Sequence, residues 1–324
     1  MTLRLSGFYS PAAAKKRRQF PFYSHHISNT PTAAPQARAP TIPGPVPDTR
    51  PPKFKLPPGA CDCHAHVFGP QNRYPYLPQA TYIPPDALAG DYARMLKTLG
   101  CKRGVLVQPS VYGTDNAAML DALHSGIFAF RGVAVVDDQI SDRELEDMHR
   151  AGVRGVRINL ASTTPGLTLE QAPRLAARLK ALGWHLQFFF DIGKVSGIEE
   201  RLSKLDIDIV IDHFGRVRAD DGVDAPPFRT LLRLLRRDNV WAKLMGPHFL
   251  SDKMPDFPDV TPFACAAAAA APDRVVWGTD RPHPSAHGLA PNDGALADLL
   301  LDWIPDEAQR QKVLVTNPAR LYGF

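Results

Sequence analysis

The chain has 324 residues, of which 44% are hydrophobic and 22% charged, and its formal net charge is +5. These are globular proportions with enough apolar material for a sizeable core, and no stretch approaches the roughly 18 consecutive apolar residues that a membrane span requires. The positive charge is confined to residues 1–59, which hold nine basic residues and one acidic residue, so the rest of the chain is net negative. This distribution argues against a nucleic-acid-binding protein.

Residues 1–59 also hold 12 of the 32 prolines and few groups that could form a core. We therefore expect a disordered, Pro-rich, basic extension before a folded body at residues 60–324. The basic run at residues 15–20 resembles a twin-arginine export signal, but it lacks the apolar segment that such a signal needs. The four cysteines form no C-x-x-C pair and no disulfide framework, so we expect a reduced, cytoplasmic protein.

From residue 60 onward, short β-rich runs alternate with helical stretches. Strands are predicted at residues 61–68, 104–108, 132–136, 155–159, 185–190, 207–212, 240–245 and 274–279. Helices are predicted between and after them at residues 86–99, 115–125, 142–151, 169–182, 195–205, 228–236, 261–271 and 293–303. Eight βα units in a body of this size predict an α/β fold, a (β/α)8 TIM barrel with a disordered N-terminal extension.

A doubly wound open sheet is the alternative fold. Such a sheet usually has a Gly-rich phosphate-binding turn after its first strand. Here the first predicted strand ends in His64-Ala65-His66 instead, which favours the barrel.

Polar and charged side chains gather at the carboxyl ends of the predicted strands, where functional residues of such barrels lie. They are His64, His66, Gln108, Ser110, Asp137, Arg157, Asn159, His213, Lys243 and Asp280. Asp62, His64 and His66 alternate along one strand and should share one face. Because closure of a barrel makes the last strand a neighbour of the first, we expect Asp280 to approach the two histidines.

Two histidines in an H-x-H pattern, with an aspartate from the last strand, are also the skeleton of a catalytic zinc site. The residues alone leave two alternatives: a centre that needs no cofactor, or zinc held by His64, His66 and Asp280. His185 begins its predicted strand and lies about 13 Å below Phe189, so we interpret it as a hydrogen-bonded histidine of the barrel floor rather than a ligand. For Lys243 an internal salt bridge is favoured over a Schiff-base role.

The motifs carry a resemblance to a known family. His64-Ala65-His66, Ile211-Asp212-His213, Trp277-Gly278-Thr279-Asp280 and Asn317-Pro318-Ala319-Arg320 resemble the amidohydrolase-related family over residues 60–324. Residues 61–70, 108–116 and 155–160 resemble the branch that contains 2-pyrone-4,6-dicarboxylate lactonase, sulfomuconolactone hydrolase and galactarolactone isomerase. The resemblance implies a TIM barrel that hydrolyses or isomerises small acidic lactones. It implies no metal through the first of these enzymes and zinc through the second.

The resemblance also implies roles for single residues. His64, His66 and His213 would cradle the lactone carbonyl, and Asp280 would be the general base for the attacking water. The substrate's carboxylate and ring oxygens would be held by Tyr82, Ser110 and Arg157. These roles suit the chemistry, because an ester carbonyl develops oxyanion charge as water adds and an arginine binds a carboxylate with two donors.

Three positions depart from the dicarboxylate lactonase. Ser162-Thr163-Thr164 provides no second cation after the arginine of the fourth strand, Phe189 stands where that enzyme has a tyrosine, and Phe249 or Leu250 stands where it has an arginine. We therefore do not expect the pyrone dicarboxylate itself as substrate. Our hypothesis is that Arg281, next to Asp280, restores one cation at the mouth of the site.

The sequence thus predicts a cytoplasmic hydrolase whose partner is a small acidic lactone, without nucleic acid or membrane. One alternative is a zinc-dependent decarboxylase or amide hydrolase on the same barrel. The other is a catalytically silent barrel that binds a ligand. No phosphate-binding loop, flavin motif or nicotinamide motif is present in the sequence.

Overall fold

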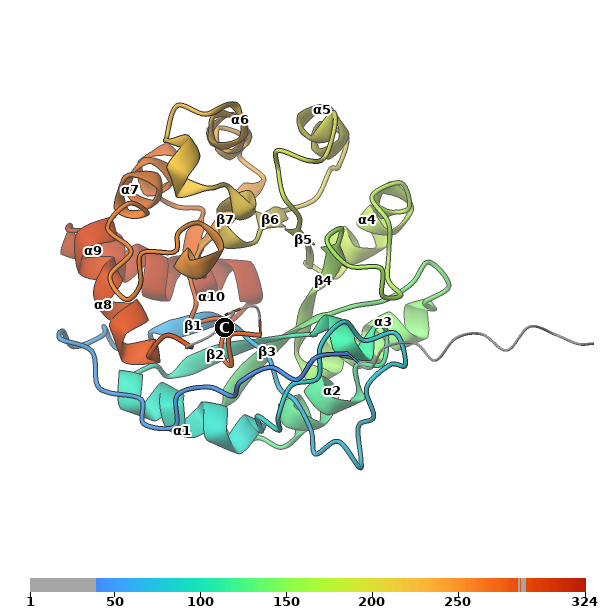
Figure 1. Ribbon diagram of the computed structural model, residues 1–324. Coiled ribbons are helices and arrows are strands. Elements are labelled where there is room, and N and C mark those ends of the chain that lie inside the picture. Colours follow the sequence, from blue (N-terminus) through green and yellow to red (C-terminus); the bar gives the residue numbers. More distant parts are fainter. Residues whose placement is uncertain (1–38, 285, 287–289) are drawn as a thin grey trace, which may run out of the picture. The chain divides into compact units, whose positions relative to one another are not determined.

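The computed structural model describes residues 39–284, 286 and 290–324, and these form eight parallel strands surrounded by helices (Figure 1). The strands are β1 (Cys61–Ala65), β2 (Arg103–Val107), β3 (Ala129–Ala134), β4 (Val153–Asn159), β5 (His185–Phe189), β6 (Ile209–Ile211), β7 (Val240–Leu244) and β8 (Val275–Trp277). Their order in the sheet is the order in the chain. The predicted (β/α)8 barrel is confirmed.

The eight helices expected between and after the strands are all present. They are α1 (Ala89–Leu99), α2 (Ala117–His124), α3 (Asp142–Ala151), α4 (Ala172–Ala181), α5 (Ile198–Ser203), α6 (Pro226–Leu235), α7 (Thr261–Ala270) and α8 (Asp293–Trp303). The chain ends with α9 (Glu307–Gln311), a short π-helical segment η5 (Lys312–Thr316) and α10 (Asn317–Tyr322). In the described part of the chain, no helix is long and apolar enough to cross a membrane.

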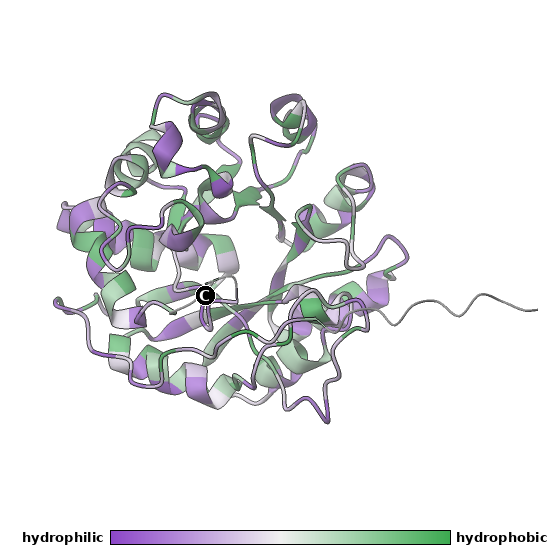
Figure 2. Ribbon diagram, in the orientation of Figure 1, coloured by the Kyte–Doolittle hydropathy of each residue, from purple (hydrophilic) through white to green (hydrophobic). Residues whose placement is uncertain are grey.

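Apolar burial on both faces explains why the strands pair in parallel. Every residue of β1, β6, β7 and β8 is buried, as expected for strands that face side chains inside the barrel and helices outside it. Figure 2 shows the hydrophobic colouring concentrated on the strands, with mixed colouring on the helices. The helices are therefore amphipathic covers, and the polar residues buried at the strand ends stand out against this apolar background.

The barrel closes just beyond the end of β8. The backbone N–H of Asp280 donates to the carbonyl of His64 over 2.9 Å, and the N–H of His66 donates to the carbonyl of Arg281 over 2.7 Å. A parallel bridge between Ala65 and Arg281 marks the same junction. The predicted approach of the last strand to the histidine pair is therefore made by the backbone itself.

Asp62 strengthens this junction rather than joining the polar cluster. Its carboxylate accepts hydrogen bonds from the backbone N–H of Thr279 over 2.9 Å, the Thr279 hydroxyl over 2.6 Å and the His64 N–H over 3.1 Å. The register of β1 against β2 shifts between Asp62 and Ala65. Gly278 allows the close approach, because a Cβ there would lie 2.8 Å from the His64 nitrogen.

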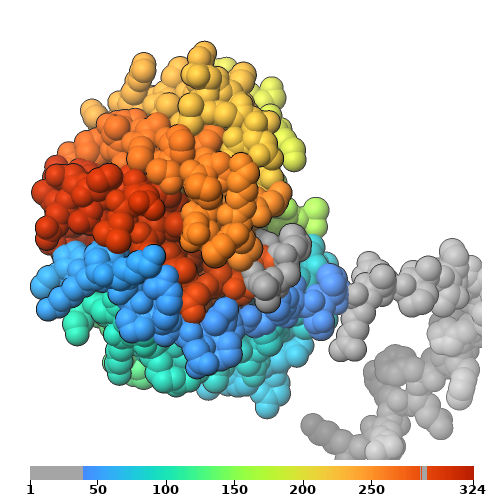
Figure 3. Space-filling model, turned by 60° about the vertical axis from the view of Figure 1, so that its left-hand side comes forward, coloured from blue at the N-terminus to red at the C-terminus, as the bar shows by residue number. Residues whose placement is uncertain are grey.

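The folded region begins earlier than we expected. Residues 39–59, which we assigned to the disordered extension, lie along the barrel surface (Figure 3). Ile42 and Ile83 are joined by a backbone hydrogen bond, the Lys53 N–H donates to Asp298 on α8 over 2.6 Å, and Leu56 is buried. The sequence did not reveal these contacts, because the proline and basic residues of this segment are typical of a disordered extension. The rest of that assignment, residues 1–38, lies outside the described residues.

His185 lies on the floor of the barrel, as its place in the sequence predicts, and its polar neighbours are the Gln187 side chain and the Arg154 backbone. The ring packs edge-on against Tyr322 with centroids 5.3 Å apart, and a Cβ on Gly155 would lie 2.5 Å from it. Burial lowers the pKa of His185 to about 3.

This buried imidazole makes stability depend on pH. The pKa of His185 is about 3 in the folded chain and near 6.5 when exposed, so the unfolded chain takes up the proton first. The contribution of the neutral ring to the free energy of unfolding is complete above about pH 6.5 and is lost as the pH falls toward 3. By pH 5 the loss of stability is roughly 2 kcal/mol. We expect urea unfolding at pH 7 and pH 5 to show a smaller loss of stability for His185→Gln than for the wild type.

His124→Gln is the matched control, because His124 is exposed. It should keep the pH dependence of the wild type. A His185→Gln variant with the wild-type dependence would show that this ring titrates normally in the folded chain.

Candidate active site

Three histidines surround one carboxylate oxygen at the carboxyl end of the barrel. His64 lies on β1, His66 just after it, His213 after β6 and Asp280 after β8. The Asp280 Oδ1 atom is 3.7 Å from His64 Nε2, 3.6 Å from His66 Nε2 and 3.9 Å from His213 Nε2. All four side chains are buried. The structure thus brings together the four residues to which we assigned catalysis.

The backbone around this cluster is unusual. Asp280 has a φ of 67° and His213 a φ of 49°, and Phe214 and Arg216 also have positive values. Non-glycine residues rarely adopt this region, and such strain gathers at functional sites. Here it turns two side chains from different strand ends toward each other.

His248 is a fourth imidazole that sequence reasoning missed. It lies in the short helix η4 (Pro247–Phe249) after β7, with its Nε2 3.8 Å from Asp280 Oδ2. The two oxygens of Asp280 therefore face different groups. In the sequence, the position of His248 shortly after the seventh predicted strand could have marked it as a site residue, next to Phe249 and Leu250.

Burial and neighbouring charges set the protonation of the cluster. Burial by itself would raise the pKa of Asp280, but His213, His66 and His64 outweigh it and lower that pKa below its usual range. Burial lowers the pKa of His213 to about 4. Near neutral pH the cluster is therefore an ionised carboxylate beside a neutral His213.

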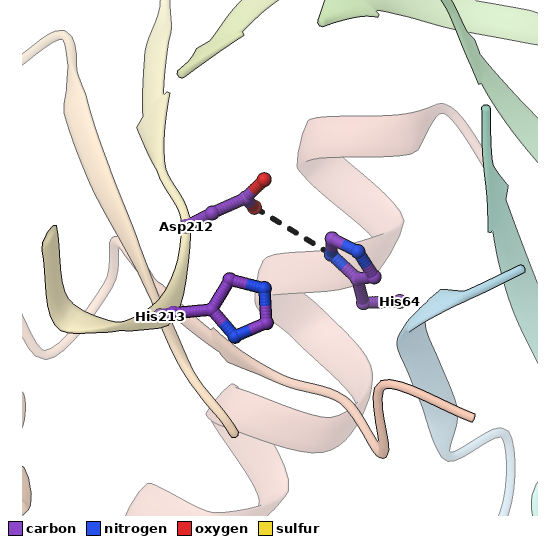
Figure 4. Close-up of side chains that lie close together, drawn as sticks. All are labelled: His64, Asp212 and His213. Atoms are coloured by element: carbon purple, nitrogen blue, oxygen red, sulfur yellow. Dashed lines mark ion pairs between the residues drawn. The ribbon is translucent and has the colours of Figure 1, made fainter. Parts of the chain in front are cut away.

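A second carboxylate lies beneath the cluster. Asp212 Oδ1 is 3.5 Å from His64 Nδ1, an ion-pair geometry that Figure 4 marks with a dashed line. Its other oxygen accepts from Gln187 over 2.9 Å and from Arg157 Nε over 3.2 Å. Burial would raise the pKa of Asp212, but the Lys243 ammonium lowers it well below its usual range.

Lys243 is fully buried between these groups. Its Nζ lies 3.0 Å from the Cys63 carbonyl, 3.1 Å from His64 Nδ1 and 3.6 Å from Asp212 Oδ1. The internal salt bridge that we favoured over a Schiff-base role is present.

An open cavity of about 380 Å³ lies next to the cluster and holds several of the expected binding residues. Its lining includes Tyr82, Ser110, Asn159, Phe189, Arg216, His248 and Phe249. Arg157 faces a narrower hollow shared with Ser110 and Asn159. The structure therefore places Tyr82, Ser110 and Arg157 on one side of the cluster.

Arg216 is a cation that we did not single out in the sequence. Its guanidinium carbon lies 5.1 Å from the ring centre of Phe189 and 5.3 Å from that of Phe249. Among the residues that the structure describes, no carboxylate forms an ion pair with it. Arg216 is the last residue of the short helix η2 (His213–Arg216). In the sequence, its position three residues after the strand-end histidine His213 could have marked it as a residue near the site.

Arg281, which by our hypothesis restores a cation at the mouth, is paired with a carboxylate. Its guanidinium forms a close ion pair with Asp293 at the start of α8, and His283 Nε2 lies 3.1 Å from the same carboxylate. Thr49 also contacts Arg281 over 3.4 Å. With His66, Arg281 lines a different cavity, of about 500 Å³, beside α1. A carboxylate on α8 that the sequence did not connect to this position neutralises the charge.

The suggested zinc ligands fit an ion only in part. Single atoms of His64, His66 and Asp280 lie within 4.8 Å of one another, close enough to share one ion. His66 is suited to this role, because its Nδ1 bonds the Val107 carbonyl over 2.7 Å and leaves Nε2 as a lone pair. His64 is less suited, because a metal on its Nε2 would require a proton on Nδ1, and the acceptor nearest to that nitrogen, Asp212 Oδ1, is 3.5 Å away. That nitrogen faces the Lys243 ammonium, which can only donate.

Known proteins resemble this chain over nearly its whole described length. A family profile described as Amidohydrolase matches residues 61–324. The chain is 39% identical over 284 residues to 4-sulfomuconolactone hydrolase of Hydrogenophaga intermedia, an alignment that covers 86% of this chain and 94% of that protein. It is 40% identical over 281 residues to 2-pyrone-4,6-dicarboxylate hydrolase of Comamonas testosteroni, covering 84% and 92%.

A solved structure has the same architecture. The apo crystal structure of Agrobacterium tumefaciens ATU3138 superimposes with a TM-score of 0.75 at 32% sequence identity, covering 84% of this chain and 98% of that one. The sequence resemblance and the barrel therefore agree.

The ion pair between Arg281 and Asp293 should support the fold. Both side chains are buried, so Asp293→Asn leaves Arg281 without its anion, and we expect the variant to lose about 3–5 kcal/mol in urea unfolding. Asp302→Asn, on an exposed position of the same helix, should stay within about 0.5 kcal/mol of the wild type. Equal stability of the two variants would contradict the structural role of this pair.

Proposed function

The chain belongs to the amidohydrolase family, and from this premise we propose that it opens the ester bond of a small, carboxylated lactone by adding water. The observation that carries the proposal is the position of Asp280, a buried carboxylate with three imidazoles within 3.9 Å of one of its oxygens. Two of the proteins that this chain resembles at about 40% identity have names that describe hydrolysis of lactones.

The cluster provides a base and donors where ester hydrolysis needs them. Asp280 is ionised, so it takes a proton from water while the water oxygen bonds to the carbonyl carbon of the lactone. The π electrons of the carbonyl move to its oxygen, where N–H groups of the cluster stabilise the negative charge. When this adduct collapses, the ring C–O bond breaks and the ring oxygen takes the proton from Asp280. The carboxylate is regenerated, and the product is an open-chain acid.

The cavity favours a substrate with one carboxylate. Arg216 is the cation there that no described carboxylate neutralises, and the aromatic rings of Phe189 and Phe249 hold it in place. Arg157 is balanced by Asp212 through its Nε, and its terminal amino groups form no hydrogen bond with a described residue. Ser110 and Tyr82 add hydroxyl groups for the ring oxygens. A second carboxylate would meet aromatic carbon rather than a free cation.

The thiols support an intracellular setting for this activity. All four cysteines are unpaired, and three of them are buried in the fold. Structural disulfides are rare in the cytoplasm, where thiols stay reduced. We place the enzyme there.

The test of the function is turnover of a panel of mono- and dicarboxylate lactones, followed as acid release and by separation of the products. We expect the wild type to open monocarboxylate lactones and Asp280→Asn to lose roughly 10²- to 10⁴-fold in kcat, because the amide cannot accept the proton. Asp238→Asn is the matched control, since Asp238 is exposed and precedes β7, away from the strand ends that carry the site. Its rate should equal that of the wild type.

Unchanged turnover in a folded Asp280→Asn variant would show that Asp280 is not the general base. Hydrolysis of amides, or decarboxylation, without lactone opening would favour the other enzyme class on this barrel. A thermal shift with sugar acids or pyrone acids but no turnover would favour a ligand-binding barrel.

Recognition of the carboxylate should depend on Arg216. We expect Arg216→Met to raise the KM of an anionic lactone about 10- to 100-fold with a smaller effect on kcat, because a charge-assisted hydrogen bond is lost. Arg218→Met is the matched control in the same loop, because Arg218 already pairs with Asp252 over 3.1 Å. If the two variants raise KM equally, Arg216 does not select the carboxylate.

A further inference from the structure

We propose that Lys243 is a positioning residue that keeps the proton of His64 on Nε2, so that this imidazole donates to the lactone carbonyl and does not bind zinc. That the hydrogen bond from His64 goes to a lactone carbonyl rests on the proposed function. That the His64 proton is on Nε2 does not, because contacts within the protein fix its position.

The Lys243 ammonium can only donate hydrogen bonds, so it decides which neighbouring atoms must accept. An ammonium group has three N–H donors and no acceptor. Three atoms surround Nζ: the Cys63 carbonyl at 3.0 Å, His64 Nδ1 at 3.1 Å and Asp212 Oδ1 at 3.6 Å. The carbonyl oxygen and the ring nitrogen lie within hydrogen-bonding distance of Nζ, and the ring nitrogen can accept only if it is a lone pair. A proton on Nδ1 would instead point at the ammonium hydrogens.

Asp212 competes for the same ring nitrogen and is the weaker partner. Its Oδ1 lies 3.5 Å from His64 Nδ1, beyond the usual N–H···O range, whereas Lys243 lies within hydrogen-bonding distance. Asp212 is already the acceptor for Gln187 and Arg157 on its other oxygen. The shorter contact therefore sets the tautomer, and the neutral His64 ring carries its proton on Nε2.

His66, two residues along the chain, has the opposite tautomer. Its Nδ1 lies 2.7 Å from the Val107 carbonyl, which can only accept. A proton on Nδ1 is therefore fixed by this contact, and Nε2 lies 3.6 Å from Asp280 Oδ1. The two rings therefore differ at Nδ1, which carries a proton in His66 and none in His64, and His64 donates to the carbonyl oxygen from Nε2.

The charges of the buried cluster agree with this assignment. Lys243 and Arg157 are balanced by Asp212 and Asp280, and all four are at most 5% exposed. A divalent ion would bring two uncompensated positive charges into this closed site, which is costly in a medium of low polarity. Lys243 supplies from within the chain the cation that a metal would otherwise provide.

Histidine tautomers can be read directly from long-range 1H–15N correlation spectra of the full-length chain labelled with 15N-histidine. The signals of the two rings are identified by their loss in His64→Gln and His66→Gln. We expect His64 to show its proton on Nε2 and His66, an internal control in the same spectrum, to show it on Nδ1. A His64 proton on Nδ1 in the wild type would overturn the proposal.

Removal of the lysine tests its role. In Lys243→Met, Asp212 becomes the remaining partner of His64 Nδ1, and we expect the proton to move to that nitrogen. Equilibrium dialysis against zinc chloride should then show one zinc ion per chain that is lost on adding His64→Gln. The wild type and Lys97→Met, a variant at an exposed position of α1, should show no zinc that depends on His64. An unchanged tautomer in folded Lys243→Met would also overturn the proposal.

These measurements separate this inference from the proposed function. If Lys243→Met does not fold, the wild-type tautomer and the His64-dependent zinc content of the wild type still decide. If the wild type opens no lactone in the panel, the proposed function fails while the tautomer result stands. If the wild type opens lactones but binds zinc through His64, the inference fails and the function stands.

Discussion

The junction between the first and last strands is the constraint on which the site depends. Two backbone hydrogen bonds, from Asp280 to the His64 carbonyl and from His66 to the Arg281 carbonyl, join residues more than 200 positions apart. They fix the base and two imidazoles on adjacent backbone segments. Asp62 holds the same junction from below through Thr279. Without this closure the four residues would have no common position, because nothing in their local sequence brings them together.

The buried charges beneath the junction are tolerated because they compensate one another. An isolated charge in such a place would cost several kcal/mol, and a buried pair is retained only where its hydrogen bonds are satisfied. Asp212 Oδ2 accepts hydrogen bonds from Gln187 and Arg157, and its Oδ1 faces the Lys243 ammonium at 3.6 Å. The cluster therefore fixes the orientation and the protonation of the catalytic rings above it, and this is a functional rather than a stabilising use of buried charge.

The sequence predicts what strand periodicity and strand ends determine. All eight strands follow from the alternation of apolar runs with amphipathic helices, and the meeting of His64, His66, His213 and Asp280 follows from closure of the ring. What it could not provide depends on partners distant in the chain. The pairing of Arg281 with Asp293, the packing of residues 39–59 on α8 and the contact of His248 with Asp280 leave no periodic trace in the sequence. The protons on His64 and His66 likewise depend on Lys243 and Val107, which lie on other strands.

The residues assigned to the chemistry and those that face the open cavity come from different parts of the fold. The residues to which we assign water activation, and those that hold the buried charges, lie on strands or directly at their ends, where packing fixes them. Those that face the open cavity, Arg216, His248 and Phe249, lie in short helices of the loops after β6 and β7. Loops on a rigid barrel can change without disturbing the strands. Changes in these loops can therefore alter which acid fits the cavity while the buried cluster at the strand ends stays in place.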